Sequence, residues 1–218
     1  MARNANNTMA QKIIDHALEI IDTEGFEALT MRHLASRMGT SAPNIYNYYA
    51  SKDELFCAIR IQGFESLALK LHQAYQHNSE PSARVRAMLN AYIEFGNEHR
   101  SCYQTIFNRP KPNGNNPKRI ADYMELEKRI ARKIPQLIQR ALRDVNADLC
   151  NSFSDGEINL SILHIWSLLH GTVCISHGMN PIMEESLSAG MPSLIDRLAT
   201  DLSQGRLPAC GASAAYSN

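Results

Sequence analysis

The sequence lacks the features that mark several large classes of protein. Its five cysteines are odd in number and scattered, without the spacing of a zinc site or of a disulfide framework. The first residues, MARNANNTMA, contain no apolar core of a signal peptide, and no run of about eighteen apolar residues predicts a membrane span. These absences together predict a cytoplasmic protein with reduced cysteines and no structural metal.

Catalytic motifs are missing as well. The sequence has no Gly-x-Ser-x-Gly elbow, no phosphate-binding Gly-Lys loop, no Gly-x-Gly-x-x-Gly turn and no His-Glu-x-x-His zinc motif. The pairs His72/His77 and His164/His170 are five and six residues apart, a spacing that suits two metal ligands on one helix poorly. We therefore expect no enzyme, and we predict no catalytic residue, no metal and no cofactor.

Charge is balanced over the whole chain, with a formal net charge of zero. A protein that coats a polyanion along its full length is therefore not expected. Between Glu27 and Asp53, however, there is no acidic residue, and this segment carries Arg32, Arg37 and Lys52. One segment is locally basic although the chain is neutral.

Helical patterns dominate what is present. No stretch alternates apolar and polar residues between turn signals, whereas helical spacing of apolar residues recurs from end to end. Three helix starts carry a capping pattern, in which a hydroxyl binds the third amide and a Gln or Glu side chain reaches back. They are Thr8-x-x-Gln11, Ser51-x-x-Glu54 and Ser154-x-x-Glu157. We predict an all-α chain.

Glycine and proline set the predicted helix boundaries. Gly25 should end the first helix in the left-handed conformation, the second helix should stop at Gly39, and residues 109–117 should form a loop. Pro135 should kink or divide the seventh helix, and the ninth should start afresh at Pro192. The predicted helices, about nine, cover residues 9–24, 30–39, 41–48, 51–77, 81–99, 101–108, 118–146, 157–178 and 192–205.

The second and third predicted helices form the outline of a helix-turn-helix. A short helix ends at Gly39 and a second short helix begins near Ser41, the helix that would lie in the major groove of DNA. Its polar side chains can bind phosphates or base edges, while Ala42 and Pro43 leave a slim tip and Arg32 can fork onto guanine. Tyrosines in short helices are also common packing residues, so this alternative stays open.

This segment resembles a known family. Residues 16–59 are similar to the DNA-binding headpiece of TetR-type (tetracycline-repressor-like) transcriptional regulators. The residues that carry the resemblance are Gly25, Phe26, Thr30, Leu34, Ala35, Gly39, Ser41, Ile45, Tyr46, Tyr49, Ser51 and Lys52. The sequence WSLLHG, Trp166 to Gly171, also resembles the Trp-x-x-x-His-Gly signature of one class of TetR-type ligand-binding domains.

The resemblance implies a repressor that binds a palindromic operator as a homodimer. It implies a three-helix headpiece at 1–52, joined by a long fourth helix to a larger helical ligand-binding and dimerisation domain at 53–207. From the sequence itself we expect the tail at 208–218 to be disordered. The chain departs from the family at Ala42, often Lys or Gln, and at Asn47, often His or Trp. Implied phosphate contacts are Thr30, Ser41, Tyr48 and Lys52, and implied base-facing residues are Arg32, Ala42, Pro43, Asn44, Tyr46 and Asn47.

The family also implies a cavity for a small effector, which the apolar bias of the domain suggests is hydrophobic or aromatic. The residues do not decide whether the effector releases or tightens the DNA complex. Each candidate lining residue can equally be plain core packing. The candidates are Met88, Tyr92, Phe95, Tyr103, Phe107, Met124, Trp166 and His170.

The eighth and ninth helices are the implied dimer surface. A stripe at helical spacing runs along the eighth, formed by Ile158, Ile162, Ile165, Leu169 and Val173, although such a stripe is core of the same subunit at least as often.

Two further alternatives remain. One is a thiol sensor on the same headpiece that uses Cys57 or Cys102, and the other is a binding protein without DNA function.

Overall fold

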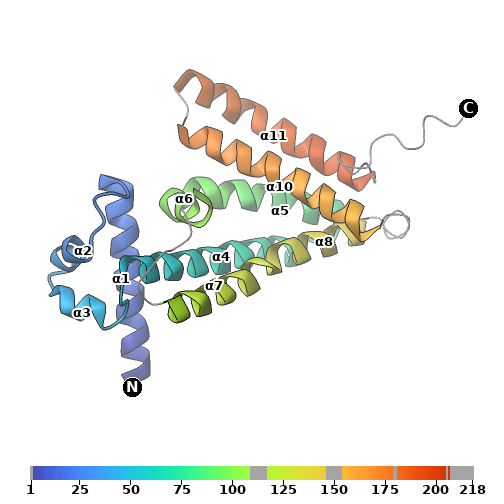
Figure 1. The fold of residues 1–218 in the computed structure, drawn as a ribbon. Coiled ribbons are helices and arrows are strands. Elements are labelled where there is room, and N and C mark those ends of the chain that lie inside the picture. The colour runs from blue at the N-terminus through green and yellow to red at the C-terminus, as the bar shows by residue number, and fades with distance from the viewer. Residues whose placement is uncertain (1, 109–116, 146–153, 179–180, 205, 207–218) are drawn as a thin grey trace, which may run out of the picture. The chain divides into compact units, whose positions relative to one another are not determined.

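The structure is a computed structural model of the chain, which describes residues 2–108, 117–145, 154–178, 181–204 and 206 (Figure 1). Every regular element in these residues is an α-helix, as the sequence predicted. The loop predicted at 109–117 and the disordered tail predicted at 208–218 lie outside the described residues, apart from Pro117. The helices are α1 (Ala2–Glu24), α2 (Met31–Arg37), α3 (Ala42–Tyr46), α4 (Lys52–Gln76), α5 (Pro81–Glu98), α6 (Arg100–Asn108), α7 (Pro117–Ala131), α8 (Lys133–Val145), α10 (Asp155–Gly178) and α11 (Pro181–Ser203).

The chain forms two compact units. The first joins residues 1–66 to residues 99–130, so it holds α1, α2, α3, the first part of α4, α6 and α7. The second joins residues 67–98 to residues 131–218 and holds the rest of α4, α5, α8, α10 and α11. α6 and α7 therefore group with the N-terminal helices rather than with α5 and α8, their neighbours in the sequence.

The N-terminal helices share one hydrophobic core with the start of α4. α2 and α3 have seven and five residues, and helices this short are unstable alone in water, so packing must hold them. α1 supplies Ile13 and Ala17 from the face that helical spacing predicted. Leu34, Ile45 and Leu55 join them from the other three helices, each at most 1% exposed. We call α1, α2, α3 and their core the headpiece.

Glycine ends the first two helices, as predicted. The φ angles of Gly25 and Gly39 are 87° and 64°, in the left-handed region that disfavours residues with a Cβ. Thr30 begins α2, and its Oγ1 accepts a hydrogen bond of 3.0 Å from the backbone N–H of His33. The end of α1 and both ends of α2 are therefore set by local chemistry.

Two of the three predicted capping patterns form. Ser154 Oγ accepts from the N–H of Glu157 at 3.3 Å, and the Glu157 carboxylate accepts the N–H of Ser154 at 2.8 Å. The pattern at Ser51 also forms, because Ser51 Oγ accepts from the N–H of Glu54 and the Glu54 carboxylate reaches back to the N–H of Ala50. The third prediction was wrong, because α1 begins at Ala2 and Thr8 lies inside it. Gln11 donates to Asp15 instead of reaching back, since the residues before Thr8 are themselves helical.

The two prolines predicted to interrupt helices, Pro135 and Pro192, act differently. A turn at Arg132 divides the long helix predicted at 118–146, and Pro135 sits in the first turn of α8, where a missing N–H costs little. Pro192, by contrast, lies within α11, so the predicted fresh start at this residue was wrong. A proline removes one backbone hydrogen bond, and the burial of Ile195 and Ala199 beyond it favours continuing the helix.

The second unit is built around α5. Gly96 allows α10 to approach closely, because a Cβ there would lie 2.5 Å from Cγ1 of Val173. His177 Nε2 lies 3.0 Å from the Gly96 carbonyl oxygen in the same contact. By length and composition α10 could also cross a membrane, but a helix buried in the core of a soluble protein passes the same test. The predicted stripe of α10, Ile158, Ile162, Ile165, Leu169 and Val173, is buried within this unit.

Candidate nucleic-acid interface and effector cavity

The tip of α3 is exposed where a helix-turn-helix would meet DNA. Ser41 begins the helix, and its side chain makes no capping hydrogen bond. Pro43 and Asn47 are exposed, and Tyr46 is 48% exposed although it is aromatic. On its other side α3 buries Ile45 in the headpiece core. Ile45 therefore holds α3 on the headpiece, while the polar residues on its other side remain exposed to solvent.

Three other predicted contacts are partly turned inward. Asn44 is half-buried, and its Nδ2 donates to Thr40 Oγ1 at 2.9 Å within the turn. Ala42 and Tyr48 are partly buried against the headpiece core. These three side chains are therefore less accessible than Ser41, Pro43, Tyr46 and Asn47.

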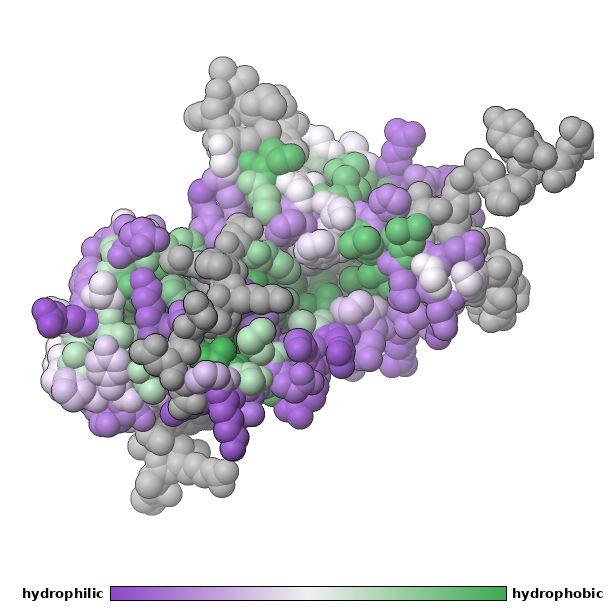
Figure 2. Space-filling model, in the orientation of Figure 1, coloured by the Kyte–Doolittle hydropathy of each residue, from purple (hydrophilic) through white to green (hydrophobic). Residues whose placement is uncertain are grey.

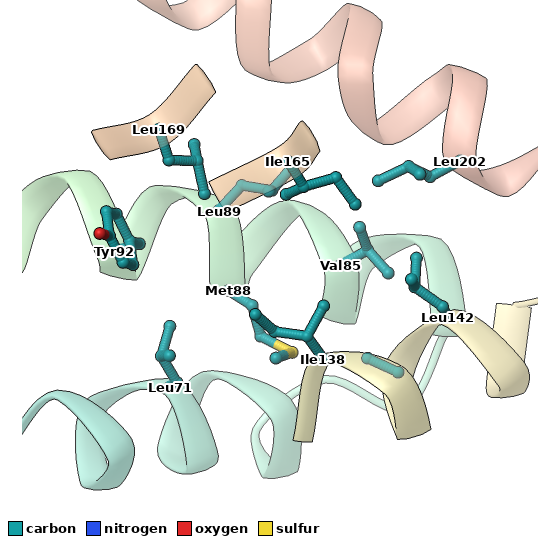
Figure 3. Close-up of a pocket in the computed structure, with 11 residues that line it drawn as sticks. Leu71, Val85, Met88, Leu89, Tyr92, Ile138, Leu142, Ile165, Leu169 and Leu202 are labelled. Carbon is teal, nitrogen blue, oxygen red and sulfur yellow. The ribbon is translucent and has the colours of Figure 1, made fainter. Parts of the chain in front are cut away.

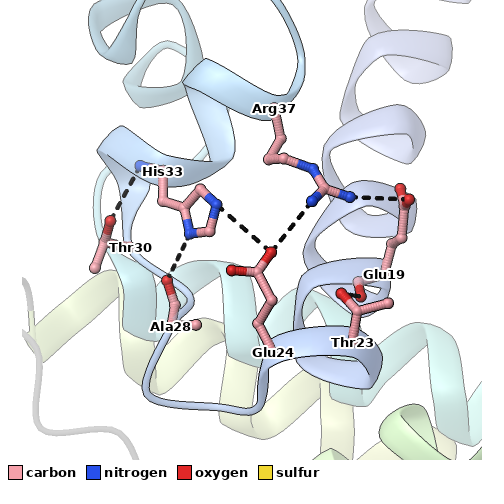
Figure 4. Close-up of polar contacts among 7 residues, drawn as sticks. All are labelled: Glu19, Thr23, Glu24, Ala28, Thr30, His33 and Arg37. Atoms are coloured by element: carbon pink, nitrogen blue, oxygen red, sulfur yellow. Dashed lines mark hydrogen bonds and ion pairs between the residues drawn. The ribbon is translucent and has the colours of Figure 1, made fainter.

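The local positive charge is smaller than the sequence indicates. Figure 4 shows Arg37 between two carboxylates of α1, with Nη1 donating to Glu24 at 3.2 Å and Nη2 donating to Glu19 at 3.1 Å. His33 Nε2 lies 3.6 Å from the same Glu24 carboxylate, and its Nδ1 lies 3.0 Å from the Ala28 carbonyl oxygen. Arg37 therefore fastens α2 to α1.

Arg32 and Lys52 are the other two cations of the basic segment. Arg32 is exposed on α2, and Thr30, the cap residue just before this helix, is exposed as well. Lys52 is half-buried, with its Nζ donating to the Phe26 carbonyl oxygen at 3.4 Å and lying 5.5 Å from the centre of the Phe56 ring. The ammonium of Lys52 is thus held at the start of α4.

A small apolar cavity lies in the second unit (Figure 3). Its volume is about 30 Å³, room for a water molecule but far below the roughly 300–1,000 Å³ of a ligand pocket. Of the eight predicted lining residues, Met88 and Tyr92 line it. The lining is Leu71, Val85, Met88, Leu89, Tyr92, Ile138, Ala141, Leu142, Ile165, Leu169 and Leu202.

The other six candidates lie elsewhere. Tyr103, Phe107 and Met124 belong to the first unit, where the Tyr103 and Phe107 rings pack 4.8 Å apart between centres. Phe95 is buried in the second unit without lining the cavity.

Trp166 and His170 form a pair of their own on α10. Their rings stack with centres 5.0 Å apart and planes at 15°. His170 Nε2 also lies 3.4 Å from Cys174 Sγ, and burial lowers the pKa of His170. Trp166 and His170 thus contact each other, and His170 also contacts a thiol on the same helix.

The outer face of α10 is unusually apolar. Four of the large hydrophobic side chains that are exposed lie on it: Leu160, Leu163, Leu168 and Ile175, between 39% and 52% exposed. Beside them a groove of about 470 Å³ runs between α10 and α11, which lie side by side in Figure 1. In Figure 2 hydrophobic side chains reach the surface over this part of the molecule.

The cysteines of the first unit are poorly suited to sensing oxidation. Burial raises the pKa of Cys57 to about 11, more than the nearby Glu127 does, and burial alone raises the pKa of Cys102 to about 11. Thiols with such pKa values are almost entirely protonated at neutral pH, and the thiolate is the reactive form. The structure thus disfavours the thiol-sensor alternative.

Two family profiles match the sequence. The one described as bacterial regulatory proteins, tetR family, matches residues 13–59, which contain α2 and α3. The one described as tetracyclin repressor-like, C-terminal domain, matches residues 85–198, just over half of the chain.

Known relatives agree with these matches. An uncharacterized HTH-type transcriptional regulator of Mycobacterium tuberculosis is 27% identical over 194 residues, 88% of this chain and 80% of that protein. The HTH-type transcriptional activator FasR of Mycolicibacterium smegmatis is 30% identical over 91 residues, 42% of each chain. The solved structure of the transcriptional regulator FadR from Bacillus subtilis in complex with stearoyl-CoA is 12% identical, with a TM-score of 0.64 over 89% of this chain and 98% of that one. At that identity the likeness concerns the fold alone.

Proposed function

Because the chain belongs to the TetR family of bacterial regulatory proteins, we propose that it is a cytoplasmic repressor that binds a palindromic operator as a homodimer. Regulators of this family are not enzymes. The observation that carries the proposal is the tip of α3, where Ser41, Pro43, Tyr46 and Asn47 are exposed at the end of a packed headpiece. A slim helix tip with hydroxyl and amide groups fits the major groove.

The proposed DNA contacts fall into two groups. Thr30, Ser41, Tyr48 and Lys52 bind phosphates, because each carries a hydroxyl or ammonium group that can donate a hydrogen bond, and all but Tyr48 lie at the start of a helix. The base-facing surface is formed chiefly by Arg32, Tyr46 and Asn47, with Ala42, Pro43 and Asn44 shaping the tip. Residues 1–52 make up the DNA-binding domain in this proposal, and residues 53–207 make up the effector and dimerisation domain.

Dimerisation follows from the size of the interface and from the outer face of α10. One headpiece offers roughly 600–1,000 Å² of contact, too little for selective binding at cellular salt. Two copies that read half-sites about 34–36 Å apart double it. The second copy packs on α10 and α11, covering the exposed Leu163 and Leu168 and the groove beside them. The buried stripe of α10 is core and takes no part.

The proposed effector is a small, mostly hydrophobic molecule that enters the cavity of the second unit. No charged side chain lines this cavity, so a charged ligand group would lose its hydration there without a partner. Among the lining residues Tyr92 is the aromatic one, so aliphatic effectors suit it better than aromatic ones. FadR, which shares the fold, was solved with stearoyl-CoA, a molecule with a long aliphatic chain. The effector must expand the cavity, which gives it a preference between two conformations.

Release of DNA then follows from that preference. Coupling between effector and operator sites typically amounts to about 1–3 kcal/mol, enough to change operator affinity about five-fold or more. A dimer that covers an operator blocks transcription, so an effector that favours the expanded cavity relieves repression. FasR is named an activator, and the opposite sign needs only the opposite preference.

Selection of bound fragments from random DNA tests the proposal. We expect the full-length protein to enrich a near-palindrome at low micromolar concentration or below, and straight-chain alcohols or acyl compounds to weaken that complex. Failure to enrich any sequence, with protein shown to be folded by circular dichroism, contradicts the DNA-binding function. Enrichment of a single unrepeated half-site contradicts the dimer instead.

A further inference from the structure

Among the residues that the structure describes, Glu54 is the one charged residue that is buried. It is 1% exposed and lies in the first turn of α4. Its Oε2 accepts the backbone N–H of Ala50 at 2.9 Å, and its own N–H donates to Ser51 Oγ at 3.1 Å. This is the capping arrangement that the sequence predicted at Ser51. The other carboxylate oxygen, Oε1, is buried and accepts no hydrogen bond. A buried carboxylate in this state needs a nearby positive charge.

Arg119, near the start of α7, supplies that charge. Its Nε lies 3.1 Å from Glu54 Oε1, and its Nη2 donates to the backbone carbonyl of Tyr48 at 3.5 Å. Tyr48 comes two residues after the end of α3, and Glu54 lies in the first turn of α4. One guanidinium therefore contacts both ends of the short connection that joins α3 to α4.

α7 is itself fixed within the same unit. Arg60 of α4 donates to Glu127 of α7 from Nε at 2.9 Å and from Nη2 at 2.5 Å. Arg60 Nη1 also donates to the Thr105 carbonyl oxygen of α6 at 3.5 Å. Arg119 thus reaches the connection from a helix that is anchored elsewhere, so its contacts restrain the connection instead of merely following it.

We propose that Arg119 is a positioning residue for DNA binding, which fixes the orientation of α3 on α4 although it lies outside the helix-turn-helix. This inference rests on the proposed DNA-binding function. α3 has five residues and cannot keep its orientation by its own stability. Without Arg119 the Glu54 charge is unbalanced, and the connection has one restraint less. The fraction of molecules with α3 correctly placed falls, and the apparent operator Kd rises by the same factor.

The test uses the full-length protein and a duplex that the parent selects from a random-sequence library. Arg119→Met removes the charge and keeps most of the side chain. Arg129→Met is the matched control, because Arg129 is an exposed arginine on the same helix. We expect about tenfold weaker operator binding for Arg119→Met, partial recovery in Arg119→Lys, and parental binding for Arg129→Met.

The salt dependence of binding separates positioning from direct contact. A phosphate contact that is lost lowers the slope of log K against log salt by about one. A positioning residue leaves this slope at the parental value. Parental affinity for Arg119→Met, or a slope reduced by about one, overturns the proposal. If the parent itself selects no DNA, the proposed function fails instead.

A second variant covers the case in which Arg119→Met does not fold. Glu54→Gln removes the charge that Arg119 balances and keeps an oxygen for the Ala50 N–H. We expect it to weaken operator binding severalfold, and the double variant Glu54→Gln/Arg119→Met to bind no worse than the weaker single variant. Losses that multiply in the double variant, or parental binding by a folded Glu54→Gln protein, contradict the pairing of these two residues.

Discussion

Arg60 of α4 and Glu127 of α7 form a two-point ion pair in the first unit, with side chains 17% and 16% exposed. Two parallel N–H···O bonds fix the geometry of such a pair, and its low exposure limits screening by solvent. The pair has the opposite polarity to Glu54 and Arg119, since here the base lies on α4 and the acid on α7. α4 and α7 are thus joined at two positions along their length.

Loss of one member of the Arg60–Glu127 pair should destabilise the protein. Glu127→Ala leaves a poorly hydrated guanidinium, and we expect a loss of about 2–3 kcal/mol in the free energy of unfolding. Urea denaturation followed by circular dichroism measures it. Lys128→Ala on the same helix is the control, because Lys128 is 59% exposed and should change stability by less than about 0.5 kcal/mol. Equal effects of the two substitutions would show that the pair adds nothing.

Gly39 should be sensitive to any Cβ. Its φ of 64° makes Gly39→Ala unfavourable by about 1 kcal/mol, although the space around it is open. Gly39→Asn should lose less, because asparagine tolerates the left-handed region. Thermal unfolding of the three proteins orders them. A Gly39→Ala protein as stable as the parent would mean that the turn readily adopts another conformation.

Tyr46 and Lys52 should differ in how their loss affects DNA binding. Tyr46→Ala removes a base-facing side chain, so it should cost about 1–3 kcal/mol of preference for operator over random DNA. Lys52→Ala removes a phosphate contact, so it should weaken both DNAs alike and lower the salt slope by about one. Competition binding at three salt concentrations distinguishes these patterns. Parental binding by both variants would show that α3 does not face the DNA.

The outer face of α10 should hold the dimer together. Leu163→Glu places a charge in the proposed interface, and we expect monomers at concentrations where the parent is dimeric. Leu69→Glu is the control, because Leu69 is an exposed leucine of the same kind, 57% exposed, on α4. Light scattering after gel filtration gives the masses. A dimeric Leu163→Glu protein would place the interface on another surface.

Cys57 and Cys102 should be unreactive in the folded protein. At a pKa of about 11, roughly one thiol in ten thousand is ionised at pH 7. We expect neither residue to be alkylated by iodoacetamide within an hour, whereas both react in urea, as mass spectrometry of tryptic peptides would report. Micromolar peroxide should leave operator binding unchanged. Rapid labelling of either cysteine in the native state would revive the thiol-sensor alternative.

Features that depend on neighbouring residues were predicted correctly. The left-handed Gly25, the helix stop at Gly39, the caps at Ser51 and Ser154, and the division of the helix before Pro135 all follow from chemistry within a few residues. The predictions at Thr8 and Pro192 failed for one reason. A residue that can start a helix does so only where the residues before it are not helical. At Thr8 and Pro192 the preceding residues are helical, and a local pattern does not specify this.

The candidate site shows the same division. The helix-turn-helix could be located from Thr30, Gly39 and Ser41, but the neutralisation of Arg37 by Glu19 and Glu24 could not, since these acids lie on another helix. Likewise, helical spacing identified the stripe of Ile158 and Val173 without indicating which face of α10 the chain itself covers.

The sequence by itself determined that the chain is all-α, where the helices capped by local glycine, serine and threonine residues begin or end, and which short helix carries the polar tip. Those properties arise from hydrogen bonds and backbone preferences that act over one or two turns. Only the tertiary structure decided which charges remain available, which leucines stay exposed, and that Glu54 faces Arg119. Such contacts join residues far apart in the chain, and their energy depends on burial, which no local pattern specifies.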